Sequence, residues 1–275
     1  MFENKQLLVF PIVILVLTFA IAAFFLSPII VLFAAQGFHS VAAHHSYDFH
    51  NANPLIWVYF VLTYFVSMFF ATFFNVAFYH EILEGLQGRP VSISNGLAFA
   101  CMRWQSILLW SLFAGAIGYV IRALEEKFGL IGRIVMGMVG MAWSVACVFV
   151  IPVIIQEQAT SNPITMLKKS VATLRKTWGE SLIGYVGIKF GGAVVAVFSI
   201  LWLGAAIGVS ILLHSVVLGG IAIAVWLVAV IGFGYIMSVA NQIFRCALFL
   251  YASNGSMPHP FSDDMAAAAW KLKKS

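Results

Sequence analysis

Long apolar segments separated by short polar ones make up most of this chain. A helix needs about 20 apolar residues to cross the ~30 Å hydrocarbon core of a bilayer, and six segments reach that length. They are residues 7–35, 54–85, 105–124, 132–155, 181–213 and 216–251. Pro11 and Pro28 lie within the first segment and predict a kinked helix there. The pattern predicts an all-α integral membrane protein, with residues 1–275 forming a single transmembrane domain of six transmembrane helices.

Residues 163–178 follow a different pattern. Apolar side chains recur there at spacings of three and four, at Ile164, Leu167, Val171, Leu174 and Trp178. The opposite face carries four cations, Lys168, Lys169, Arg175 and Lys176. Asn162 or Ser161 can cap such a helix, and Pro163 suits its first turn. We therefore predict an amphipathic helix that binds the anionic membrane surface through its four cations and Trp178.

Two other segments share this design. Residues 91–104 place Ile93, Leu97, Cys101 and Trp104 on one face, and residues 262–274 begin with a serine cap and two aspartates. Each of the three surface helices follows a pair of spans, which divides the chain at 1–104, 105–178 and 179–275. A threefold hairpin repeat explains this order. The alternative is that any protein with an even number of spans and cytoplasmic loops shows it.

The distribution of cations predicts the orientation. Six spans place both termini on one side of the membrane, and eleven of the fifteen lysines and arginines fall on that side. They are Lys5, Arg89, Arg103, Lys168, Lys169, Arg175, Lys176, Arg245, Lys271, Lys273 and Lys274, whereas Arg122, Lys127 and Arg133 fall on the other side. Because cytoplasmic loops carry the excess of positive charge, we expect cytoplasmic N- and C-termini in a bacterial inner (plasma) membrane. The composition agrees with a membrane protein, since 9% of the residues are charged, whereas roughly a quarter are charged in a soluble domain.

A histidine-rich stretch, HSVAAHHSYDFH at 39–50, separates the first two spans. His44, His45, Asp48 and His50 are the candidate metal ligands, because histidine and carboxylate suit zinc. Their spacing matches no established ligand pattern. The alternative is a polar loop on the outer face, and we expect no cofactor.

A second histidine motif, HEILE at 80–84, ends the second span. It begins like the HExxH helix of metalloproteases but has Glu84 where the second histidine would stand. The plainer interpretation is that His80, Glu81 and Glu84 cover the end of a span that projects into water.

Polar residues inside the spans are the remaining candidates. Lys189 lies about eight residues into the fifth span, where it is either functional or snorkels to the cytoplasmic interface. Asn75 and Asn241 suit hydrogen bonds between helices better than catalysis. Gly204-xxx-Gly208 permits close helix contact, either inside the bundle or in a homo-oligomer.

Several motifs together resemble a known family. They are FFNVAF at 73–78, RALEEKFGLIGR at 122–133, GLIGRIVMGMVGMAWSVACVFVIPVIIQE at 129–157, LKKSVATLRKTWGESLIGY at 167–185 and IFRCALFLYASNG at 243–255. They resemble the uncharacterised prokaryotic polytopic membrane proteins grouped as domain of unknown function 6159. The resemblance implies a multi-span membrane fold and carries no activity. It does not include the histidine-rich stretch.

These observations favour a non-enzymatic protein, because the sequence holds no P-loop, GxSxG elbow or other catalytic set. We expect a transporter-like or membrane-organising component that handles lipid or another apolar molecule. Its expected partners are membrane lipids and further copies of itself or other membrane proteins, and no nucleic acid. Two alternatives stay open at this point: a scaffold for other membrane proteins, and a membrane-embedded metal-dependent hydrolase.

Overall fold

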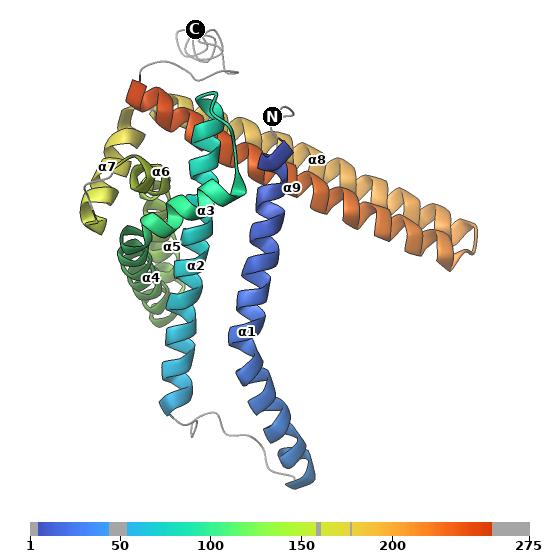
Figure 1. Ribbon diagram of the computed structural model, residues 1–275. Coiled ribbons are helices and arrows are strands. Elements are labelled where there is room, and N and C mark those ends of the chain that lie inside the picture. Colours follow the sequence, from blue (N-terminus) through green and yellow to red (C-terminus); the bar gives the residue numbers. More distant parts are fainter. Residues whose placement is uncertain (1–4, 44–53, 158–160, 177, 255–275) are drawn as a thin grey trace. The chain divides into compact units, whose positions relative to one another are not determined.

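The computed structural model describes residues 5–43, 54–157, 161–176 and 178–254, and every regular element within these ranges is a helix (Figure 1). The elements are α1 (Lys5–Ala43), α2 (Pro54–Leu86), α3 (Ile93–Met102), α4 (Trp104–Lys127), α5 (Leu130–Ala146), α6 (Val150–Gln156), α7 (Pro163–Lys176), α8 (Trp178–Leu212) and α9 (Val216–Asn254). The predicted all-α fold is confirmed. The predicted helix at 262–274 lies outside the described residues.

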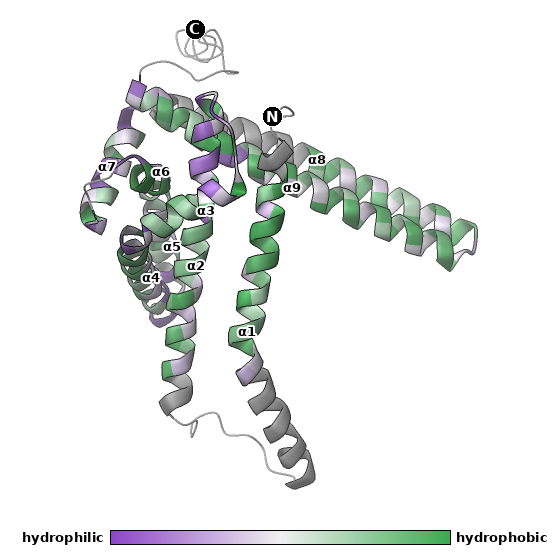
Figure 2. Ribbon diagram, viewed as in Figure 1, coloured by the Kyte–Doolittle hydropathy of each residue, from purple (hydrophilic) through white to green (hydrophobic). Residues whose placement is uncertain are grey.

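Six apolar helical segments in the described ranges are long enough to cross a membrane. Five of the predicted spans are single helices, namely α1, α2, α4, α8 and α9. The fourth span, 132–155, is formed by α5 and α6 together. Figure 2 shows hydrophobic residues along most of the described part of α1 and α2, with hydrophilic residues where α2 leads into α3. The prediction of a six-span membrane protein is therefore confirmed.

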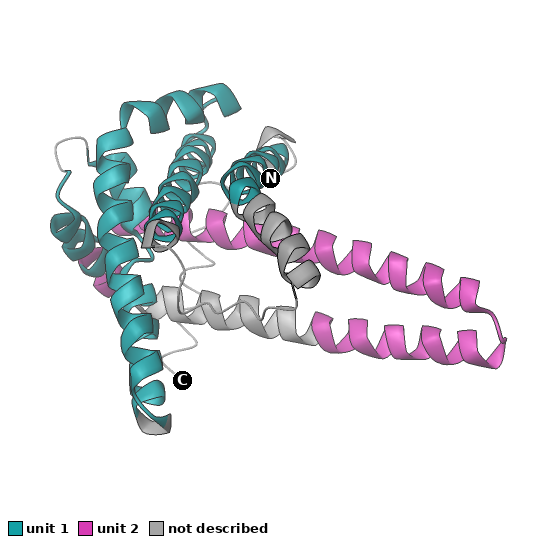
Figure 3. Cartoon of the chain, turned by 90° about the horizontal axis from the view of Figure 1, so that it is seen from below, with its two compact units in different colours: residues 1–171 teal, residues 172–275 magenta. Residues whose placement is uncertain are grey.

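The chain forms two compact units, residues 1–171 and residues 172–275, and the boundary falls within α7 (Figure 3). The proposed threefold repeat, with boundaries after residues 104 and 178, stays a prediction.

In the first unit, α2 contacts α1, α3, α4 and α6. The ring centroids of Phe10 in α1 and Phe78 in α2 are 5.3 Å apart, and Phe10 is fully buried. On another side of α2, the Tyr64 hydroxyl donates to the Gly115 carbonyl of α4 at 3.2 Å. A Cβ on Gly115 would lie 3.2 Å from the Phe65 ring, so the glycine permits the close approach of these two helices.

A tight turn ends α2 and starts the path to α3. Gly88 adopts φ of +75°, a conformation that glycine reaches without strain. The Arg89 amide reaches back to the Glu84 carbonyl at 3.0 Å, which closes the helix end as a Schellman motif does. Pro90 follows, and α3 begins three residues later.

The second unit contains the hairpin of α8 and α9, which contact each other. At its turn His214 takes φ of +52°, and the Ser215 amide donates to the Ser210 carbonyl at 3.1 Å. The Ser215 hydroxyl then accepts from the Leu218 amide at 3.4 Å, as a helix cap does at the start of α9.

Candidate functional site

A buried carboxylate docks α3 on α2. Glu81 is 0% exposed, and one of its carboxylate oxygens accepts from the Ser92 amide at 2.6 Å. Ser92 is the N-cap residue of α3, where backbone N–H groups lack helical partners. The negative charge therefore satisfies one of these groups at the positive end of the helix dipole. Glu81 thus joins α3 to α2, and the interpretation that it covers a projecting end is wrong for this residue.

The other members of the HEILE motif extend this cluster. His80 Nδ1 lies 3.1 Å from the other Glu81 oxygen, and the His80 ring stacks on Phe99 of α3 with centroids 4.0 Å apart. Glu84 receives both an Nε and an Nη bond from Arg89. These bonds and the Glu84 charge raise the pKa of Arg89, because they stabilise its cationic form. The cluster is a satisfied network that fastens the end of α2, the turn and α3 together.

The face of α3 that packs on the protein is built of small residues. Gly96 and Ala100 are its buried positions. A Cβ on Gly96 would lie 2.7 Å from the Ala77 carbonyl oxygen of α2, so only glycine allows this approach. The predicted apolar face lies beside the docked one, since Cys101 and Trp104 are exposed. Small residues therefore dock α3, whereas Cys101 and Trp104 of the predicted apolar face are exposed. That this apolar face lies against the membrane surface stays a prediction.

The fourth span is interrupted between Ala146 and Val150. Pro152 accounts for the break, because proline has no N–H to donate to the Val148 carbonyl and its ring clashes with that carbonyl in a straight helix. The short α6 that follows is buried within the protein. A break at this depth is tolerated where protein groups satisfy the freed backbone groups.

Ser170 of α7 forms hydrogen bonds with the backbone groups at the break. Its hydroxyl donates to the Ala146 carbonyl at 2.6 Å and accepts from the Phe149 amide at 3.1 Å. In a straight helix the Ala146 carbonyl would accept from Val150, but the Val150 amide bonds Cys147 instead at 3.1 Å. Ser170 is 0% exposed, so one hydroxyl bridges both sides of the break away from water.

The neighbouring residue of α7 holds the far end of α6. Lys169 Nζ lies 2.5 Å from a carboxylate oxygen of Glu157, the residue that caps α6. The side chains are 40% and 38% exposed, so the pair sits at the edge of the protein. Two consecutive residues of α7 therefore fasten the two ends of α6.

The docked face of α7 shares only part of the predicted apolar face. Met166, Ser170 and Leu174 are buried, whereas Ile164 of the predicted apolar face is 52% exposed. The burial follows every fourth residue, as one helix face does. As in α3, a docked face and an exposed apolar position lie on the same short helix.

The four predicted lipid-binding cations do not have equal surroundings. Lys168, Arg175 and Lys176 are exposed, whereas Lys169 is half-buried and paired with Glu157. Trp178 is the first residue of α8, and its side chain lies outside the described residues. The cationic surface of α7 is defined here as Lys168, Arg175 and Lys176.

Of the remaining predicted residues, the structure describes the side chains of Asn75 and Asn241. Asn75 and Asn241 each donate to the carbonyl four residues earlier in their own helix, at 2.8 and 2.9 Å. The side chain of Lys189 in α8 lies outside the described residues. The stretch with His44, His45, Asp48 and His50 also lies outside them. Within the described ranges no three histidine, cysteine or acidic side chains are grouped as metal ligands would be.

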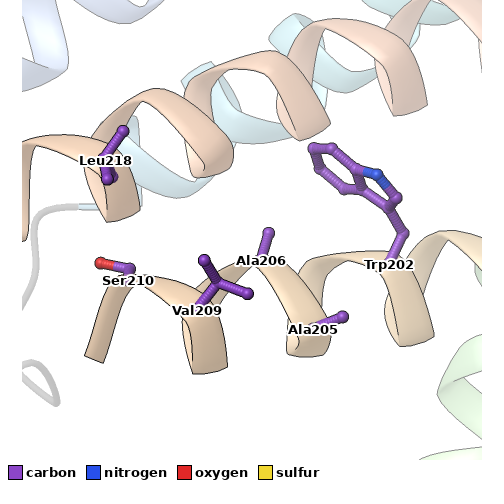
Figure 4. A pocket seen from close by; sticks show the side chains of 6 residues that line it. All are labelled: Trp202, Ala205, Ala206, Val209, Ser210 and Leu218. Carbon is purple, nitrogen blue, oxygen red and sulfur yellow. The ribbon is translucent and has the colours of Figure 1, made fainter. Parts of the chain in front are cut away.

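A small apolar depression of about 320 Å³ lies between α8 and α9 near their turn. Figure 4 shows Trp202 rising from α8 toward α9, beside the low floor made by Ala205 and Ala206. Val209, Ser210 and Leu218 complete its lining. The Ser210 hydroxyl donates to the Ser215 carbonyl at 2.7 Å, so the lining presents almost only carbon atoms.

The fold and its six apolar helices define a multi-pass α-helical membrane protein. A family model described as "Family of unknown function (DUF6159)" matches residues 53–259, and the chain belongs to this family. The resemblance noted in the sequence is thereby confirmed. No curated protein and no solved structure matches the chain.

Sequence reasoning missed the docking roles of Glu81, Ser170 and Glu157, although it named Glu81 as part of the HEILE motif. Ser170 lies in the middle of a cationic segment, and Glu157 follows an apolar one, so neither stands out. Pro152 was the available signal, because a proline inside a span predicts an interruption that needs a polar partner.

Proposed function

We propose that this protein is a non-enzymatic component of the bacterial inner membrane, with cytoplasmic termini, that binds anionic phospholipid and organises or moves lipid or another apolar molecule. The observation that carries the proposal is the cationic surface of α7, Lys168, Arg175 and Lys176. These exposed cations lie on a helix whose other face docks beside an interrupted span.

The electrostatics support an anionic lipid as the ligand. The cytoplasmic leaflet carries a negative surface potential, and each cation near it contributes about 1 kcal/mol of attraction. The exposed apolar side chain of Ile164 lies one turn from Lys168 and suits the boundary between headgroups and acyl chains. The apolar depression between α8 and α9 suits part of an apolar molecule.

Lipid composition around the protein tests this proposal. The full chain is extracted from cells in polymer-bounded native discs, and the anionic fraction of the co-extracted phospholipid is compared with that of the whole membrane. We expect enrichment of anionic phospholipid around the wild type and a severalfold lower enrichment around K168Q/R175Q/K176Q. The matched control, R122Q/K127Q/R133Q, also removes three cations, but from the region predicted to lie outside the cell.

Equal enrichment around the wild type and the α7 variant would contradict the proposal. An equal loss in both triple variants would also contradict it, because it would reflect net charge rather than this surface. The orientation has its own test: a phosphatase fused after Phe128 should be active, since the enzyme folds only outside the cytoplasm, and one fused after Glu157 should be inactive.

A further inference from the structure

The short helix α6 is attached to α7 at both of its ends. α6 is seven residues long, and a turn without continuous helical bonds separates it from α5. Its two ends are fastened by Lys169 and Ser170, which are adjacent in α7. Any displacement of this part of α7 therefore pulls on both ends of α6 at once.

The two fastenings respond differently to their surroundings. Ser170 is fully buried, and its hydroxyl bonds the Ala146 carbonyl and the Phe149 amide. The Lys169–Glu157 pair is more than a third exposed on both sides, so solvent and other anions reach it. Lys169 also lies next to Lys168, which belongs to the cationic surface of α7.

A lipid phosphate on that surface competes with Glu157 for Lys169. Phosphate and carboxylate both accept charge-assisted hydrogen bonds from an ammonium group, and lysine serves either as a point charge. Where phosphate takes Lys169, Glu157 and the end of α6 lose their fastening. The break at Cys147–Phe149 then lacks one of its two constraints.

We propose that α6 and α7 form a lipid-responsive lever hinged at Cys147–Phe149, in which an anionic headgroup on α7 releases Glu157 from Lys169 and loosens the inner end of the fourth span. The proposal rests on the lipid binding proposed above. It gives that binding a consequence inside the bundle, at the one predicted span that the described structure builds from two helices.

Hydrogen exchange at the hinge tests the lever. The full chain is placed in nanodiscs of phosphatidylcholine alone or of phosphatidylcholine with phosphatidylglycerol, and exchange is followed by mass spectrometry in peptides covering residues 146–153. We expect exchange up to about fivefold faster in the anionic discs, the range set by the loss of one part-exposed ion pair. Peptides from α4 serve as the internal reference and should not respond.

Variants separate the lever from a general effect of lipid. E157Q should make exchange at the hinge fast in both kinds of disc and abolish the difference between them, because the competition no longer exists. S170A should speed exchange in both discs while retaining the lipid dependence, whereas S170T, which keeps the hydroxyl, should stay near the wild type. S144A is the matched control, because that hydroxyl bonds only the Gly140 carbonyl of its own helix.

Wild-type exchange that is equal in both discs, or slower in the anionic discs, overturns the lever. A lipid dependence that persists in E157Q overturns it as well. Lipid enrichment in the native discs described under the proposed function shows which proposal fails. Enrichment without a response at the hinge removes the lever and leaves the proposed function, whereas absence of enrichment removes both.

Discussion

The short helices α3 and α7 each follow a span and are predicted to lie on the cytoplasmic side of the membrane, yet they are fastened in different ways. α3 is held by a fully buried carboxylate, Glu81, and by the close approach of Gly96 to the α2 backbone. α7 is held by the Ser170 hydroxyl at a helix break and by a part-exposed ion pair of Lys169. Glu81 and Gly96, which hold α3, are both buried, whereas the attachment of α7 includes a part-exposed ion pair.

The two attachments differ in how firmly they fix a helix to the bundle. A buried charge is stable only while its partners stay in place, so removing them is costly. A part-exposed ion pair gains little, because water and salt compete for both groups. α3 therefore serves as a rigid base for the end of α2, and α7 keeps one attachment that a ligand can exchange. Four predictions test this contrast, in order of decreasing effect.

The substitution Glu81→Ala should have the largest effect. It leaves the Ser92 amide without its acceptor and His80 facing an empty space, at a cost of about 3 kcal/mol of unfolding free energy. Equilibrium unfolding in mixed micelles measures it. Glu126→Ala is the control, because Glu126 is 71% exposed and pairs only with Arg122, and it should change stability by less than about 0.5 kcal/mol. Equal losses in the two variants would contradict a rigid base.

Gly96→Ala tests the packing half of the α3 attachment. The new Cβ would lie 2.7 Å from the Ala77 carbonyl oxygen and 2.9 Å from Glu81 Cγ, so α3 must move. We expect a loss of about 2 kcal/mol, in the range that overpacking costs. Gly137→Ala is the matched control in α5, because the described structure has no atom within 4 Å of that Cβ. The control should be neutral or gain up to about 1 kcal/mol from helix propensity, and a Gly96→Ala protein as stable as this control would refute the close packing.

The spans were predictable because lipid imposes a simple requirement. A backbone in hydrocarbon must bond internally over the whole thickness, so length and apolar character locate the helices. The boundaries of α2, α8 and α9 follow the predicted spans to within a few residues. The two short helices were predictable from their apolar periodicity, because that pattern depends only on neighbouring residues.

The docking faces were not predictable in the same way. Gly96 and Ala100 are buried, yet small residues give no hydrophobic signal. Glu81 lies at the end of a span, where a carboxylate is ordinarily solvated, and only the return of α3 buries it. Ser170 acquires its role from a proline eighteen residues earlier in the sequence. Each of these depends on a contact between elements, which a single sequence does not display.

Pro152→Ala tests whether Ser170 stabilises the helix break, because it acts on the break itself. The restored N–H and the removed ring allow α5 and α6 to join into one helix. Fewer backbone groups then lack a helical partner and need a hydrogen bond from Ser170. Ser170→Ala alone should cost about 1.5 kcal/mol, because it leaves two buried backbone groups unpaired. In the Pro152→Ala background the same substitution should cost about 1 kcal/mol less, a coupling that a double-mutant cycle of unfolding free energies measures. Additive effects of the two substitutions on the unfolding free energy would show that Ser170 does not stabilise the helix break.

The Lys169–Glu157 pair should give the smallest effect, and a small effect is what the contrast requires. Both side chains are more than a third exposed, so Glu157→Gln should cost at most about 1 kcal/mol, and raising the salt concentration should shrink the difference. The exchanged pair Glu157→Lys/Lys169→Glu should recover most of the loss, because the attraction is restored with its polarity reversed. Unfolding at low and high salt measures all three proteins, with Glu126→Gln as the control for losing one exposed, paired carboxylate. A loss as large as that of Glu81→Ala would place this pair among the fixed attachments, and α7 would then be as rigid a part of the bundle as α3.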